Sequence, residues 1–444
     1  MENSFKRANS APKQSSIQRT IRYLIAKIDT ILDQQTKAIF NNQKLQDLLS
    51  IWSATHYLLQ NQDKEYIRVK IFDLKWAELY KISDTSYDLD DFLSRKILDE
   101  QDTPGQHPIS LLLSNYILDV SDPKIVNILD QIGLICSYTF IPFLNGIDFK
   151  IFDVDNLEDL DRFSFEEIHR STKFTSLVNL AKQSHSNFIG LVIPNIFFPS
   201  LLAQYNNKQQ LQIEIPTVIL GSGAFAVARI IMGSFANTGW FLDMLGTHVQ
   251  EDGISSDFGS VPNLVKRPTI KEKNLDLIHL QANAQFFLSE GKEKELSDIG
   301  MIPLCQMRNQ EKVILYNTKS LRNLYLKQLK TKELDSSSII QYLLCVCRFA
   351  HYIKIIGRTK IGSFSNVNEF QSYIQSWLIN YIASNLEAST SIKRRFPLLS
   401  AKVIINEDAF LKNNYKCMIY LKPHLVSMEI AADIVLKTSI QAPK

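Results

Sequence analysis

The chain has 444 residues, of which 45% are hydrophobic, with 49 Lys and Arg against 46 Asp and Glu. This length allows two or three domains with real hydrophobic cores, and the composition excludes a chain that is disordered throughout. The charge is uneven, because residues 339–444 hold 13 Lys and Arg against 6 Asp and Glu. A basic C-terminal part on an acidic body is able to bind an anionic partner, or is simply a solvated basic face.

The cysteines and the apolar stretches narrow the class of protein further. The five cysteines are odd in number and stand in apolar surroundings, which fits reduced core thiols in a cytoplasmic protein. No Cys-x-x-Cys and no His-Glu-x-x-His pattern occurs, so no metal and no cofactor is expected. Residues 1–16 do not read as a signal peptide. Prolines interrupt the uncharged stretch 188–207, which favours a buried strand and turn over a membrane span.

The first predicted element is a helix with an apolar seam. Ser15 and Gln18 form a capping box at its start. Apolar residues then recur at alternating spacings of four and three: Ile17, Ile21, Leu24, Ile28 and Ile31. Such a seam packs against another helix, either in a partner chain, which we favour, or on the chain's own domain. A second helix is predicted over Leu45 to Leu59.

From Tyr66 to about Leu329 the pattern predicts a mixed α/β domain. The expected strands cover residues 66–71, 110–113, 188–193 and 312–316, and the expected helices cover 92–98, 123–137 and 165–181. Polar residues at 330–338 mark a domain boundary. We therefore predict N-terminal helices in residues 1–60, a core domain in 61–335 and a C-terminal module in 336–444.

One short glycine pattern inside the core domain resembles a dinucleotide-binding loop. Gly221-Ser-Gly223-Ala-Phe-Ala226 follows a predicted strand and opens a helix, and Asp243 stands roughly where a ribose-binding acid is expected. The segment before Asp243 still reads as helix and turn rather than as a second strand. A tight entry into a buried helix is therefore the better interpretation, and a nucleotide-binding enzyme is an alternative that we do not favour.

The C-terminal module begins with a helix from about Ile339 that is apolar nearly all round, which is typical of a buried helix. A narrow polar stripe runs along it through Gln341, Arg348 and Tyr352, with His351 and Lys354 beside it. A large buried helix with a few cationic groups indicates a site of assembly rather than of catalysis, because buried polar groups need partners.

A glycine turn at 360–364, a helix over 366–386 and three strands complete the module. The strands cover residues 402–406, 415–422 and 429–437 and are joined as a meander. An exposed edge of such a sheet can accept a strand from another chain. Lys393-Arg394-Arg395 is the densest basic cluster and is able to meet phosphate or acidic side chains.

Several separated blocks together resemble the large subunit of the type VI secretion contractile sheath, the TssC/VipB/EvpB family, in a divergent branch. The blocks occur in the family's order: WSATHYLL from Trp52, PISLLLSNY from Pro108, GLVIP from Gly190, SFANTGW from Ser234, and ELSDIGMIPL from Glu295. The segment from Arg348 to Phe364, WLINY from Trp377, RFPL from Arg395 and Pro423-His424 continue the series. The family's arginine after Pro194 is replaced here by Asn195.

The resemblance implies a contractile tail-sheath-like fold and a structural role without catalysis. Family members pair with a small subunit (TssB/VipA) and polymerise around a tube of Hcp hexamers on a baseplate. Contraction drives the tube and its effectors outward, and a ClpV-type AAA+ ATPase recycles the contracted sheath. The resemblance places such a protein in the cytoplasm, with neither nucleic acid nor direct membrane insertion among its contacts. The sheath of a phage-like or extracellular injection particle, which uses a single sheath protein, is the alternative.

The resemblance also suggests roles for residues singled out above. The seam Ile17, Ile21, Leu24, Ile28 and Ile31 would contact the small subunit. The C-terminal strands would exchange between neighbouring subunits, with the candidates Tyr415, Met418, Tyr420, Ile430, Ile434 and Leu436. Contacts to the tube or between protomers would involve Lys393, Arg394, Arg395, Arg348 and His351.

Overall fold

The computed structural model describes residues 11–60, 66–84, 93, 95, 107–154, 159, 162–202, 216–246, 248–249, 255–256, 259–262, 264, 284–306, 312–329, 336–360, 367–385, 388–407, 414–424 and 434–441. The chain divides into two compact units. One comprises residues 1–57 and 198–221, and the other comprises 58–197 and 222–444. The predicted division into 1–60, 61–335 and 336–444 concerns roles in assembly and stays a prediction.

The smaller unit is built on two helices, α1 (Ala11–Phe40) and α2 (Gln43–Leu59). β5 (Val218–Gly221) pairs with β4 (Ile196–Pro199) in a two-stranded sheet. Ser50 of α2 donates its hydroxyl to the carbonyl of Leu220 over 2.7 Å, which fixes α2 to β5.

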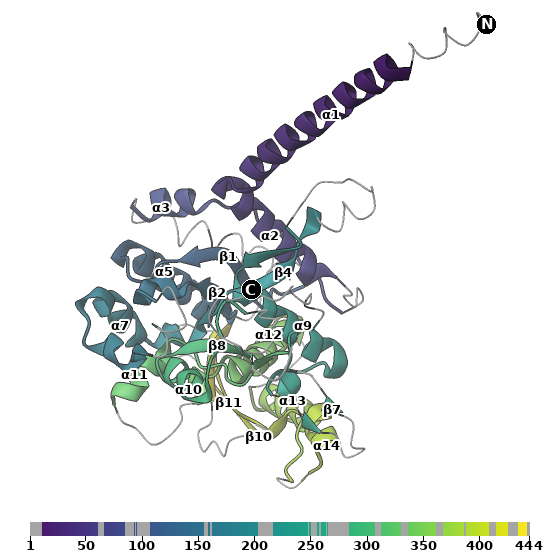
Figure 1. Cartoon of the computed structure of the whole chain (residues 1–444). Helices are drawn as coiled ribbons and strands as arrows, with labels where there is room; N and C mark the ends of the chain where they lie inside the picture. Colours follow the sequence, from purple (N-terminus) through teal and green to yellow (C-terminus); the bar gives the residue numbers. More distant parts are fainter. Residues whose placement is uncertain are drawn as a thin grey trace, which may run out of the picture. The chain divides into compact units, whose positions relative to one another are not determined.

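The larger unit contains a five-stranded sheet in the order β1-β2-β3-β8-β9, of which β1, β2 and β8 are labelled in Figure 1. The first four strands are parallel and β9 is antiparallel to β8. Every residue of β2, β3, β8 and β9 is buried. The strands span Leu112–Leu118 (β1), Phe143–Ile147 (β2), Ile189–Ile193 (β3), Met301–Gln306 (β8) and Val313–Leu315 (β9).

Helices cover this sheet, and α9 (Gly223–Thr238) packs against β1, β2 and β3. Asp122 caps α5 (Pro123–Thr139) by accepting the amide of Lys124, and a proline in the first turn suits the helix start. The other helices here are α3 (Trp76–Asp84), α7 (Thr175–Ala181), α10 (Glu290–Asp298) and α11 (Arg322–Gln328). Short 3-10 turns span Phe149–Phe152, Phe165–His169, Thr172–Phe174, Ser184–Phe188, Leu242–Met244 and Ser336–Ser338, and a small hairpin joins His248–Val249 to Ser255–Ser256.

The C-terminal module follows with α12 (Ile340–Lys360), α13 (Val367–Ile379) and α14 (Thr390–Arg395). β10 (Leu398–Glu407), β11 (Asn414–Pro423) and β12 (Ile434–Gln441) form an antiparallel sheet in chain order. The predicted meander is thereby confirmed, as is the mixed α/β class. The predicted turn at Gly362 lies outside the described residues.

The expected and the observed local structure differ in several places. Residues 67–71 form no strand with any described part of the chain. The helix predicted over 165–181 is broken into two 3-10 turns and α7, and the hydroxyl of Ser171 accepts the amide of Lys173 at the start of the second turn. β2 and β8 were not predicted, because Asn145-Gly146 in β2 and Pro303 in β8 are residues that strands usually lack.

Candidate assembly interface

The polar stripe of α12 is used inside the larger unit, and Arg348 is its most connected member. Its guanidinium lies over the rings of Phe235 and Trp240, at 4.5 and 4.7 Å from their centroids. It also donates a hydrogen bond to the carbonyl of Gly239. Gly239 ends α9 with a positive φ of 74°, a left-handed conformation that glycine adopts without strain. Arg348 thus holds the end of α9 against α12.

Aromatic side chains extend this contact to α13. Phe349 stacks on Trp240 with ring centroids 4.9 Å apart, and it meets Tyr381 edge to face at 5.5 Å. Trp377 packs on Tyr381 at 5.1 Å. The sequence block Ser234–Trp240, α12 and the end of α13 therefore share one aromatic cluster.

His351 lies beside the stripe on α12 and is buried. Its Nε2 is 3.0 Å from the carbonyl oxygen of Thr139, the last residue of α5. A carbonyl can only accept, so Nε2 carries the hydrogen in this bond. The pKa of His351 is lowered from 6.5 to about 4, mainly by burial; the Thr139 hydrogen bond opposes this shift and the charge of Lys354 adds to it. The Lys354 ammonium lies over the Phe140 ring at 4.8 Å.

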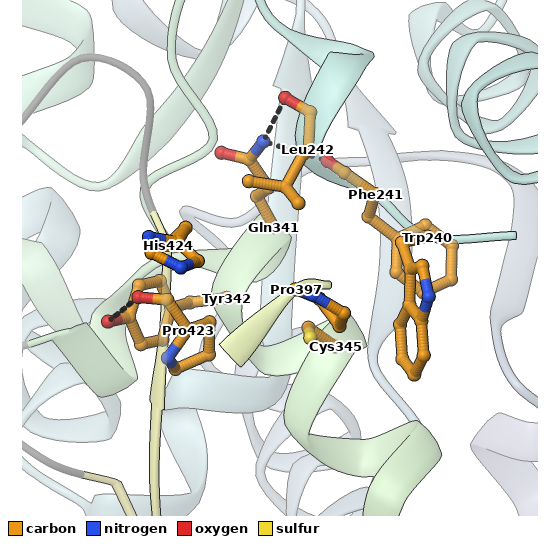
Figure 2. Close-up of a pocket in the computed structure, with 9 residues that line it drawn as sticks. All are labelled: Trp240, Phe241, Leu242, Gln341, Tyr342, Cys345, Pro397, Pro423 and His424. Atoms are coloured by element: carbon orange, nitrogen blue, oxygen red, sulfur yellow. Dashed lines mark hydrogen bonds between the residues drawn. The ribbon is translucent and has the colours of Figure 1, made fainter. Parts of the chain in front are cut away.

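A small pocket lies where α12 meets the ends of the C-terminal strands (Figure 2). The side-chain amide of Gln341 donates to the carbonyls of Phe241 and Leu242 over 2.8 and 3.0 Å. Tyr342 donates its hydroxyl to the carbonyl of Pro423 over 3.0 Å. These bonds join the core domain to the C-terminal sheet. The pocket is lined by Trp240, Phe241, Leu242, Gln341, Tyr342, Cys345, Pro397, Pro423 and His424.

The basic cluster of α14 is divided between the interior and the surface. Arg394 donates from Nε to Oδ1 of Asp243 over 2.7 Å, and the Asp243 side chain is only 1% exposed. Lys393 is partly buried, and Arg395 is exposed. Of the five predicted tube-facing or inter-protomer residues, Arg348, His351 and Arg394 thus contact groups of their own chain. Whether any of the five meets a tube or a neighbour stays a prediction.

The two edges of the C-terminal sheet differ. Along β10, the amide side chain of Gln375 accepts from Val403 N over 3.0 Å and donates to Ala401 O over 2.9 Å. Gln371 accepts from Ile405 N over 3.1 Å. Two glutamines one helical turn apart on α13 therefore hydrogen-bond backbone N–H and C=O groups of β10 that point away from β11. Sequence reasoning missed this role, because a glutamine pair at that spacing is also typical of a solvated helix face.

The described strand-exchange candidates lie on β11, the central strand of this sheet, and on β12, its other edge strand. Met418 is opposite Lys437, Tyr420 is opposite Val435, and Ile419 is opposite Leu436 in the register of β11 and β12. Tyr415 belongs to β11 and Ile434 to β12, while Ile430 lies outside the described residues. The structure places these residues in one sheet and leaves their role in exchange a prediction.

In the smaller unit, the α1 seam is exposed to solvent. Ile17, Ile21, Leu24, Ile28 and Ile31 have relative exposures of 61, 50, 50, 56 and 45%. Exposing five large aliphatic side chains along one seam is unfavourable in water, and whether another chain covers this seam stays a prediction.

The glycine pattern serves packing. Its strand, β5, lies in the two-stranded sheet and not in the five-stranded sheet. Ser222 caps α9 by accepting the amide of Ala224, and a Cβ on Gly223 would collide with the carbonyl of Pro194. Asp243, the expected ribose ligand, is the partner of Arg394. Among the described residues, no three His, Cys, Asp or Glu side chains gather as a metal site, and none of the helices is long and apolar enough to cross a membrane.

Comparison with known proteins gives matches over nearly the whole chain. The EvpB/VC_A0108 tail sheath N-terminal domain matches residues 22–322, and the EvpB/VC_A0108 tail sheath gpW/gp25-like domain matches residues 330–440. The type VI secretion system sheath protein TssC1 of Pseudomonas aeruginosa is 25% identical over 439 residues, which cover 96% of this chain and 87% of the relative.

Two solved structures align over most of the chain at low identity. The helical sheath of the anti-feeding prophage in its contracted state aligns with a TM-score of 0.42 at 9% identity, over 80% of each chain. The baseplate of the same particle aligns with a TM-score of 0.41 at 8% identity, over 84% of each chain. The two domain matches together cover most of the sequence, one after the other, and on that ground the chain belongs to the EvpB/VC_A0108 family of tail sheath proteins.

Proposed function

We propose that this sheath protein is the large subunit of a type VI secretion sheath. It pairs with a small TssB/VipA-like subunit in the cytoplasm, and the heterodimers polymerise helically on a baseplate around an Hcp tube. Contraction then expels the tube with its effectors, and a ClpV-type ATPase recycles the sheath. The observation that carries this proposal is the match of both tail sheath domains in sequence order, together with a type VI sheath relative that covers 96% of the chain.

The α1 seam is the proposed contact for the small subunit. Its alternating spacing of four and three suits a helix of a partner chain, and its five side chains are between 45 and 61% exposed. Burying such side chains against a partner helix is favourable by roughly 1 kcal/mol or more for each residue. The heterodimer would gain much of its stability here.

Strand exchange is the proposed link between neighbouring subunits. Gln371 and Gln375 hydrogen-bond the backbone groups of β10 that point away from β11. A strand from a neighbour would therefore pair with β11, on the side away from β10. β12 occupies that side within a single chain. Replacing β12 by the same strand of a neighbour keeps every ladder hydrogen bond and joins two subunits.

We propose that the sheath contacts the tube through the exposed residues of the basic cluster Lys393-Arg394-Arg395. Arg395 is exposed, and Lys393 is partly exposed. Arg394, Arg348 and His351 would act indirectly, because their hydrogen bonds to Asp243, Gly239 and Thr139 hold the module in shape. The mechanical work of contraction would come from packing between subunits rather than from a catalysed reaction.

Co-expression with a candidate small sheath subunit tests this function. Electron microscopy should show tubular filaments of regular diameter that contain both proteins, and the chain alone should form none. Filaments formed by the chain alone would instead favour the single-protein sheath of an extracellular or phage-like injection particle. Neither filaments nor a stable heterodimer would contradict both.

A further inference from the structure

The pocket between α12 and the C-terminal strands has room for one very small ligand. Its volume is about 10 Å³. A buried site needs about 10–15 Å³ to hold one water molecule, so this pocket admits a water and nothing larger. Carbon atoms of Trp240, Phe241, Pro397 and Pro423 form much of its wall. The few polar atoms in the wall therefore decide which ligand it takes.

Gln341 provides one hydrogen-bond acceptor in this wall. Its side chain is 5% exposed, and its Nε2 donates to the carbonyls of Phe241 and Leu242. Carbonyls only accept, so the amide nitrogen has to face them and the amide oxygen has to face away. Figure 2 shows this oxygen turned away from both carbonyls, to the side on which His424 lies. Among the described residues, no group donates a hydrogen bond to Gln341 Oε1.

His424 provides a second acceptor. It is 5% exposed, and its Nε2 lies 2.8 Å from the carbonyl oxygen of Ala383, so Nε2 carries the hydrogen in this bond. Burial lowers the pKa of His424 below its ordinary 6.5, the Ala383 hydrogen bond opposes this shift, and the charge of Lys393 adds to it. At neutral pH, Nδ1 therefore keeps its lone pair and can accept.

Two acceptors in one small pocket require a ligand with two donors. A hydroxyl group has only one, and an amine or amide side chain brings carbon atoms that this volume does not admit. Water has two O–H donors and is small enough. It also needs a donor for its own lone pair, and the Cys345 thiol lines the same pocket. Burial raises the pKa of Cys345 to about 12, against the opposing charge of Arg348, so the thiol keeps its hydrogen.

We propose that the pocket binds one water molecule, which donates hydrogen bonds to Gln341 Oε1 and His424 Nδ1 and accepts one from the Cys345 thiol. A buried acceptor without a donor is unfavourable, and the water removes that penalty at Gln341. It also links the start of α12 to the residue that follows β11. The water thus completes the polar contacts that join the core domain to the C-terminal sheet. This inference concerns the single chain and is independent of the function proposed above.

A structure of the full-length chain at a resolution that shows ordered water tests the proposal directly. We expect one peak of density in the pocket, within hydrogen-bond distance of both Gln341 Oε1 and His424 Nδ1. The absence of a peak, or a peak out of reach of either atom, would overturn the proposal.

Urea unfolding of the full-length chain gives a second test through a double-mutant cycle. Cys345→Val fills the pocket with methyl groups and displaces the water, and Gln341→Met removes the acceptor that needs it. We expect Cys345→Val to lower the urea midpoint of the wild type, and to lower it clearly less when Gln341→Met is also present.

The cycle contains its own control. Strain from the added methyl group occurs in both backgrounds, and the lost donor of Gln341 is common to the two Gln341→Met proteins, so both cancel in the comparison. Equal shifts in the two backgrounds, or a higher midpoint for Cys345→Val alone, would show that the pocket is dry and would overturn the water site.

Discussion

Arg394 donates a hydrogen bond from Nε to Oδ1 of Asp243 over 2.7 Å, and so fastens α14 to the turn after α9. The sequence places Arg394 in a basic cluster able to meet phosphate or acidic side chains, and it offers Asp243 as a ribose ligand only in the alternative that we do not favour. Their contact joins residues 151 positions apart in the chain. It ties the core domain to the segment that leads into the C-terminal sheet.

We expect Arg394→Ala to lower the free energy of unfolding by about 2–4 kcal/mol, because it removes the cationic partner of a carboxylate that is 1% exposed. Urea unfolding followed by circular dichroism measures this. Arg395→Ala is the matched control, since Arg395 is exposed and its loss should cost less than about 0.5 kcal/mol. Equal midpoints for the two variants would show that the ion pair contributes nothing to stability.

Arg348→Lys should also destabilise the chain, by about 1–2 kcal/mol, although the charge is kept. A planar guanidinium stacks on Phe235 and Trp240 while donating to Gly239, and an ammonium cannot do all three. Thermal unfolding and the near-ultraviolet circular dichroism of the tryptophans report the loss. Arg358→Lys, at an exposed position on the same helix, should leave both signals as in the wild type.

His351 should make stability depend on pH. Its pKa is about 4 in the folded chain against 6.5 when exposed, so the unfolded chain binds a proton first as the pH falls. Its contribution is therefore complete above pH 6.5 and is lost as the pH falls toward 4, by up to about 1.4 kcal/mol for each pH unit.

His351→Gln keeps an N–H donor for Thr139 and does not titrate. The wild type and this variant should therefore differ in the slope of unfolding free energy between pH 6.5 and 4.5. Other acid-sensitive groups, such as the buried His424, are common to both proteins and cancel in the difference. Parallel slopes would mean that His351 becomes charged without cost.

The sequence was most informative where periodicity and collinear blocks agreed. The apolar helix around Phe349, the helix α1 and the C-terminal meander could all be predicted from the pattern of apolar residues. β2 and β8 could not, because Asn145-Gly146 in β2 and Pro303 in β8 are residues that strands usually lack.

The pairing of polar side chains could not be predicted from the sequence. Nothing local tells that Gln375 serves the backbone of Val403 or that Arg394 meets Asp243, because these contacts depend on how distant segments pack. Tyr66–Ile71 shows the opposite case. Its pattern predicts a strand, and residues 67–71 form none with the described part of the chain.

The α1 seam should be required for the heterodimer and not for the fold. Ile21→Asp with Ile28→Asp places two charges on side chains that are 50 and 56% exposed, so thermal stability of the chain alone should not change. Co-purification with the small subunit should fall at least about tenfold. Ile39→Asp makes the same change on the same helix, at 60% exposure and outside the seam, and should have little effect.

Undiminished co-purification of the double variant would move the small-subunit contact away from α1. Loss with the Ile39→Asp control as well would mean that the helix as a whole, rather than its seam, is needed.

Deleting residues 429–444 should abolish polymerisation and leave the heterodimer intact. The deletion removes β12, the strand that lies along β11 on the side away from the glutamines of α13. Without it a subunit has no strand to exchange, while the α1 seam is untouched. Size-exclusion chromatography should give the heterodimer, and electron microscopy should show no sheaths. Removing only residues 442–444, which follow β12, should leave sheath assembly as in the wild type, whereas sheaths of normal length from the longer deletion would refute strand exchange.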